Sequence, residues 1–104
     1  AINTIPMATN QGFTNFICSK SIENWYLLFT LIHNIDLIKK LATGSTFLEI
    51  SKSTMRNLRL SLPNTNEQIS IVNEIRGLYN ILNQSNAQTL YSKQLKQRLI
   101  NEIF

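Results

Sequence analysis

The chain has 104 residues, of which 43% are hydrophobic, and a formal net charge of +4 at pH 7. This length accommodates one domain, or a small domain with a helical extension. The positive charge favours acidic partners, with nucleic acid first among them. The single cysteine, Cys18, excludes an internal disulfide framework and is typical of a cytoplasmic protein. No apolar run reaches the length of a membrane span, so we expect no membrane partner.

The N-terminal part has the composition of two short strands, over residues 4–9 and 12–18, joined by the turn-like Asn10-Gln11-Gly12. Pro6 restricts the first of them to the edge of a sheet. We expect Ser21 to cap a core helix over residues 22–41, because its apolar residues recur at spacings of three and four.

After that helix, Gly44 suits the left-handed position that ends many helices. Ser51 can cap a helix of one to two turns that reaches Asn57. Residues 58–62 then alternate between leucine and polar side chains, the pattern of a half-buried strand. Thr65 and Gln68 fit a capping box at the start of the next helix.

From residue 66 to about residue 103 there is no proline, and apolar residues again follow a 3-4 rhythm. The polar stretch 83–88 interrupts the rhythm, so two helices with a hinge near residues 84–87 are an alternative. We favour one helix, which would be about 55 Å long. Its apolar stripe predicts pairing with a further helix, as a spacer or dimerisation arm, or alternatively an antiparallel pair within this chain. The predicted pairing residues are Val72, Ile75, Leu78, Leu82, Leu95, Leu99 and Ile103.

Residues suited to catalysis or metal binding are scattered along the sequence. His33 has only Cys18 and Asp36 as conceivable companions, whereas a structural zinc site needs four ligands at recognisable spacing. No pair of carboxylates and no Gly-rich phosphate loop stands out. We therefore expect a protein that is not an enzyme and that uses no cofactor or metal.

Residues suited to DNA binding gather in two places. Amide side chains beside a glycine can bond to adenine edges, small hydroxyl residues can hold phosphates, and cations can neutralise them. Each group has a structural alternative: a turn, a helix end or a solvated helix face. The candidate DNA-binding residues are Asn10, Gln11, Lys39, Lys40, Thr43, Ser45, Thr46, Lys52 and Arg56.

Three segments, in this order, resemble a known family. TNQGF at residues 9–13, GSTFLEISKSTMRNLRLSLP at residues 44–63 and NEQISIVNEI at residues 66–75 are similar to the specificity subunit of type I restriction–modification systems. The resemblance spans nearly the whole chain. It implies a non-catalytic DNA-reading protein whose recognition domains are followed by long helices that pair and separate them.

The resemblance also implies an organisation and a set of partners. Residues 1–63 would be the later part of a target recognition domain, and residues 65–104 the spacer helix. We expect the fold to be α+β, with a small mixed subdomain and a long coiled-coil-type helix. The implied partners are double-stranded DNA, the adenine methyltransferase subunits and the restriction subunit, with a second copy or another specificity half as a pairing partner.

Such recognition domains normally have a further portion upstream, so we expect a truncated or partial specificity subunit. The leading hypothesis is a DNA-recognition and assembly module that needs a partner or a further segment for full function. The alternative is a protein-interaction module that acts through its helices, by dimerisation or methyltransferase docking, without touching DNA.

Overall fold

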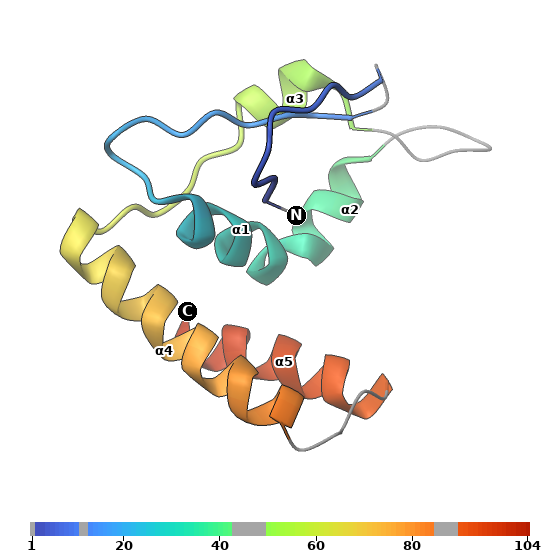
Figure 1. The fold of residues 1–104 in the computed structure, drawn as a ribbon. Coiled ribbons are helices and arrows are strands. Elements are labelled where there is room, and N and C mark those ends of the chain that lie inside the picture. The colour runs from blue at the N-terminus through green and yellow to red at the C-terminus, as the bar shows by residue number, and fades with distance from the viewer. Residues whose placement is uncertain (1, 11–12, 43–49, 85–89) are drawn as a thin grey trace.

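The computed structural model describes residues 2–10, 13–42, 50–84 and 90–104. In these residues the chain forms helices and no strand, so the expected α+β class is wrong and the fold is helical. The helices are α1 (Asn24–His33), α2 (Ile35–Leu41), α3 (Lys52–Arg56), α4 (Thr65–Gln84) and α5 (Leu90–Ile103). Figure 1 shows α4 and α5 below α1 and α2, with the N-terminal segment and α3 above them.

The three segments expected as strands, 4–9, 12–18 and 58–62, are not strands where the structure describes them. A strand needs a neighbouring strand to accept and donate its backbone hydrogen bonds. In the described N-terminal residues, the Phe13 N–H instead donates to the Asn10 carbonyl at 3.2 Å. Alternating side chains alone therefore did not produce a sheet.

The expected helix over residues 22–41 is divided at Asn34. Its N-cap is Glu23 rather than Ser21, because a Glu23 carboxylate oxygen accepts from the Tyr26 N–H at 2.9 Å. At the other end of α1 the Asn34 side chain donates to the Thr30 carbonyl at 2.8 Å. Asparagine side chains compete in this way with the helical backbone pattern. The chain then continues in a new direction as α2, while Gly44 lies outside the described residues.

The predicted cap of α3 is confirmed, and that of α4 is wrong. The Ser51 hydroxyl accepts from the Thr54 N–H at 3.1 Å, which starts α3. At α4 the residue that caps is Asn64, whose side-chain oxygen accepts from the Glu67 N–H at 2.9 Å. Asparagine is as good an N-cap as serine and better than threonine.

The single helix expected over residues 66–103 is also wrong. α4 ends at Gln84, and α5 begins at Leu90 and returns along α4 (Figure 1). Lys96 joins the two helices: its ammonium group donates to the Asn83 side chain at 2.8 Å and lies 5.1 Å from the centre of the Tyr79 ring. The helix pair within the chain, the less favoured alternative, is what the structure shows.

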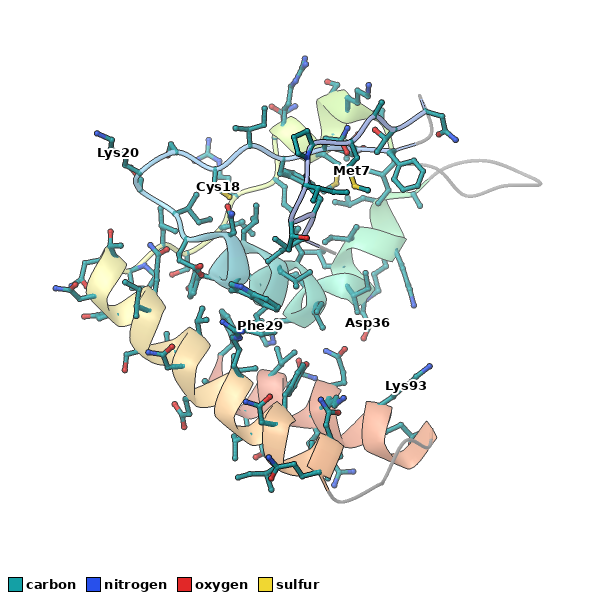
Figure 2. All side chains as sticks on the ribbon, viewed as in Figure 1. Met7, Cys18, Lys20, Phe29, Asp36 and Lys93 are labelled. Carbon is teal, nitrogen blue, oxygen red and sulfur yellow. The ribbon has the colours of Figure 1, made fainter. Side chains whose placement is uncertain are left out.

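The core lies where α1 meets the α4–α5 hairpin. Its fully enclosed residues are Phe29 from α1, Ile75 from α4 and Ile100 from α5, each at most 1% exposed. Figure 2 shows Phe29 between α1 and the hairpin. The Phe29 ring meets Tyr79 edge to face with 5.7 Å between ring centres, a favoured aromatic geometry. The segment before residue 64 and the helices after it therefore share one core.

Candidate nucleic-acid interface

Four exposed basic residues of the described chain lie at the end of α2 and on α3, while other exposed cations lie elsewhere: Lys20, Arg59, Arg76, Lys93 and Arg98. Lys39 and Lys40 occupy the last turn of α2, and Lys52 and Arg56 begin and end α3. All four are exposed. We call Lys39, Lys40, Lys52 and Arg56 the basic surface. Arg59 follows α3 in the connector to α4 and lines a cavity with residues of α1, α4 and α5, among them His33, Glu67 and Ile103.

The structure of α3 explains why its two cations share one side. Ser51 fixes the first turn by accepting from the Thr54 N–H. Asn57 closes the last turn, where its N–H faces the carbonyls of Ser53 and Thr54. Lys52 and Arg56 are four residues apart, so they are neighbours on the surface of the helix.

Lys39 and Lys40 also serve the helix that holds them. Cations in the last turn interact favourably with the negative end of the helix dipole. This interaction with the helix dipole leaves both ammonium groups accessible, because both side chains are exposed. The end of α2 is therefore a stable position for two cations that face solvent.

The remaining candidate DNA-binding residues have different outcomes. Asn10 is exposed, and its carbonyl accepts from the Phe13 N–H. Gln11, Thr43, Ser45 and Thr46 lie outside the described residues. Arg59, which is exposed after α3, is not among the candidate DNA-binding residues.

The surroundings of His33 and Cys18 favour structural roles for both residues. The His33 ring stacks on Phe104 with 5.4 Å between ring centres, and its Nδ1 lies 2.9 Å from the Asn101 side-chain oxygen. Burial, and then the charge of Glu23, raise the pKa of the Cys18 thiol. A raised pKa keeps the thiol protonated and unreactive at neutral pH. Among the described residues no three of His, Cys, Asp and Glu gather as a metal site.

The predicted pairing residues pack within the chain. Val72 and Ile75 are buried against α1, while the others are half-buried along the hairpin and at its end: Leu78, Leu82, Leu95, Leu99 and Ile103. The apolar residues that α4 leaves exposed are Ile69, at 44%, and Ile81, at 64%.

None of the described helices combines the length and the apolar character that crossing a membrane requires. The geometry is that of a small helical domain with a basic surface on one side and a helical hairpin on the other.

Comparison with known proteins identifies the class. The family model for the type I restriction modification DNA specificity domain matches residues 1–97. The chain belongs to this family. It is 36% identical over 73 residues to the type I restriction enzyme MjaIX specificity subunit of Methanocaldococcus jannaschii. This match covers 68% of the chain and 17% of the relative's length, so the chain corresponds to a small part of that protein. No solved structure matches it.

Proposed function

We propose that this chain is the part of a type I specificity subunit in which a DNA-contacting surface meets the helices that organise the assembly. The basic surface is the observation that supports DNA contact most directly. It places exposed cations at the end of α2 and along α3, away from the α4–α5 hairpin (Figure 1). Cations in such an array hold DNA through its phosphates and orient the base-reading groups.

The chain does no chemistry in this proposal. It supplies sequence recognition, whereas methylation and cleavage belong to the adenine methyltransferase and restriction subunits. The family assignment supports this division of work. Residues 1–63 provide the recognition part and residues 65–104 the helical part. The two parts share one core, in which α1 packs against both α4 and α5.

Exposed apolar residues support function within a larger assembly. The N-terminal segment exposes Ile5, Met7, Phe13, Phe16 and Ile17, and Ile17 is 99% exposed. A free small protein rarely leaves so many large apolar side chains in water along one segment. Together with the small share of the relative that the chain covers, this favours further polypeptide packing here.

The test of DNA contact is the salt dependence of binding by this chain in its complex with the methyltransferase subunits. The double substitution Lys52→Ala/Arg56→Ala removes two cations of the basic surface. Each lost phosphate contact lowers the slope of log K against log salt concentration by about 0.9. We therefore expect the slope to fall by about 1.8 and the affinity to drop at all salt concentrations.

The control removes the same charge elsewhere. Lys93→Ala/Arg98→Ala changes two exposed cations of α5, and Figure 2 shows Lys93 on the opposite side of α2 from α3. This variant should keep the wild-type slope. An unchanged slope in the α3 variant, or an equal fall in both variants, would contradict the proposed role of the basic surface.

The second candidate function is helix-mediated assembly without DNA contact. The exposed Ile69 and Ile81 of α4 favour it, since a second copy, another specificity half or a methyltransferase subunit could cover them. Sedimentation of the chain at high concentration, alone and with methyltransferase, tests this. A monomer that also fails to bind methyltransferase would exclude it.

A further inference from the structure

A cavity of about 380 Å³ lies between α1, the connector from α3 to α4, the first turns of α4 and the end of α5. This volume lies within the range of pockets that hold small organic ligands. Tyr26 and Thr30 of α1 are buried and form its floor, while Arg59 and Glu67 are exposed and form its rim. The cavity is separate from the basic surface, none of whose four residues lines it.

The hydroxyl of Thr30, on the floor of the cavity, has no hydrogen-bond partner among the described residues. Thr30 is only 4% exposed, which keeps bulk water from this hydroxyl. Buried polar groups nearly always have a partner, because leaving one unpaired destabilises the fold. A threonine in a helix has two accessible positions about its first side-chain bond, so the hydroxyl can turn toward a molecule that enters the cavity. Such a molecule would provide the missing partner.

The two charged groups at the rim differ in their surroundings. A Glu67 carboxylate oxygen accepts from the Asn64 side chain at 3.4 Å, and Glu67 stands in the first turn of α4, where the helix dipole favours negative charge. The Arg59 guanidinium has no hydrogen-bond or ion-pair partner among the described residues. Arg59 therefore favours an anionic ligand group. The nearby Glu67 repels a doubly charged phosphate more strongly than a singly charged carboxylate.

Apolar side chains make up much of the remaining wall. Ile71 of α4 and Ile103 of α5 belong to it, and so does Phe104, whose ring stacks on His33. The Tyr26 hydroxyl on the floor donates to the Ser61 carbonyl at 3.3 Å, so its own proton is already engaged. A ligand that fits this cavity has an apolar body beside its charged group.

We propose that this cavity binds a carboxylate carried on an apolar body. Arg59 holds the carboxylate, and the Thr30 hydroxyl donates to an oxygen of the ligand. The carboxylate comes either from a free organic acid or from an acidic side chain or chain end of another subunit. This site does not depend on DNA contact, so its failure would leave the proposed function untouched.

The first arm of the test uses hydrocinnamate as the probe and the neutral hydrocinnamamide as its counterpart. Titration of the chain with each compound, followed by the NMR signals of the backbone amides, gives the dissociation constants. We expect hydrocinnamate to bind with a Kd of about 1 mM and to shift the signals of Thr30 and Ile71. Hydrocinnamamide should bind at least about ten times more weakly, because it offers Arg59 no charge.

The second arm tests the Thr30 hydroxyl. Thr30→Val removes the hydroxyl and keeps the shape of the side chain. Without hydrocinnamate this variant should melt about 5 °C higher than the wild type, because an unpaired buried hydroxyl is gone. It should also bind hydrocinnamate about tenfold more weakly, whereas Thr30→Ser, which retains a hydroxyl, should keep the binding. A Thr30→Val variant that melts lower and binds hydrocinnamate like the wild type would overturn the role of Thr30.

The third arm tests the cation at the rim. Arg59→Gln should weaken hydrocinnamate binding about tenfold and leave the melting temperature unchanged, because Arg59 is exposed. The matched control is Arg98→Gln, which removes an exposed cation of α5 outside the cavity and should bind hydrocinnamate like the wild type. Equal weakening in both variants would mean general attraction of anions and would overturn the site.

The complex with methyltransferase subunits distinguishes the two sources of the carboxylate. If a partner's carboxylate fills the cavity, the complex does not bind hydrocinnamate and Arg59→Gln weakens the assembly. If a free acid is the ligand, the complex binds hydrocinnamate as the chain does alone, and Arg59→Gln leaves the assembly intact. Equal binding of hydrocinnamate and hydrocinnamamide by the chain, or no binding of hydrocinnamate at about 20 mM, would overturn the proposal.

Discussion

Burial decides what individual polar residues do in this chain. Gln68 lies in the core and is retained there by backbone partners from two other segments. Nothing in the sequence near Gln68 signals this, because its spacing from Thr65 is that of a capping box. The partners of a buried amide come from distant parts of the chain and are set by tertiary packing.

Replacing Gln68 by glutamate should make stability depend on pH. The introduced carboxyl is buried, so its pKa in the folded state lies above the value of about 4.3 that it has when unfolded. Such a group contributes stability that is complete below about pH 4.3 and is lost as pH rises through the folded-state pKa. We expect Gln68→Glu to be closest to wild type near pH 4 and about 2 kcal/mol less stable at pH 7. Urea unfolding at several pH values measures this, and a constant difference would contradict it.

Tyr79 predicts a further pH dependence, at the alkaline end. Burial raises the pKa of its hydroxyl above the ordinary value of 10.0. The stability that this shift contributes is present below pH 10.0 and is lost as pH rises through the folded-state pKa. The wild-type protein should therefore lose stability more steeply above pH 10.0 than Tyr79→Phe does. If the stabilities of the wild type and of Tyr79→Phe fall equally as pH rises above 10.0, burial does not raise the pKa of the Tyr79 hydroxyl.

At the scale of the elements, one of the three predicted caps was right, and at α1 and α4 a neighbouring residue, Glu23 or Asn64, caps instead. Ser51 lies three residues before Thr54, and the predicted bond is present. The division at Asn34 could not be predicted, because apolar residues continue at helical spacing on both sides of it. Likewise, the apolar residues of α4 and α5 follow the same 3-4 spacing. This spacing does not predict whether two helices continue in line or turn back.

The α4 helix contains a glycine that its surroundings do not require. An added Cβ at Gly77 would meet no atom within 4 Å. Alanine in a helix interior is about 1 kcal/mol more favourable than glycine. We expect Gly77→Ala to stabilise the chain by about this amount, which thermal unfolding should register as a rise of about 5 °C. If Gly77→Ala lowers the stability instead, another segment or chain contacts α4 at this position under the conditions of the measurement.

At the scale of the whole molecule, the sequence predicted the class of protein better than its architecture. The ordered segments at residues 9–13, 44–63 and 66–75 pointed to the specificity family, and the family match over residues 1–97 confirms it. The strands were wrong because a strand depends on a partner that the described chain does not provide. Lys39, Lys40, Lys52 and Arg56 are exposed, as charged residues usually are, and their contact with DNA stays a prediction.

The side of the molecule that faces DNA can be measured directly. Lysine acetylation of the chain in its methyltransferase complex, with and without bound duplex and followed by mass spectrometry, compares all lysines in one experiment. We expect DNA to protect Lys39, Lys40 and Lys52, and to leave Lys93 on α5 as reactive as before. Protection of Lys93, with unchanged reactivity of the three lysines in the basic surface, would contradict DNA contact through the basic surface.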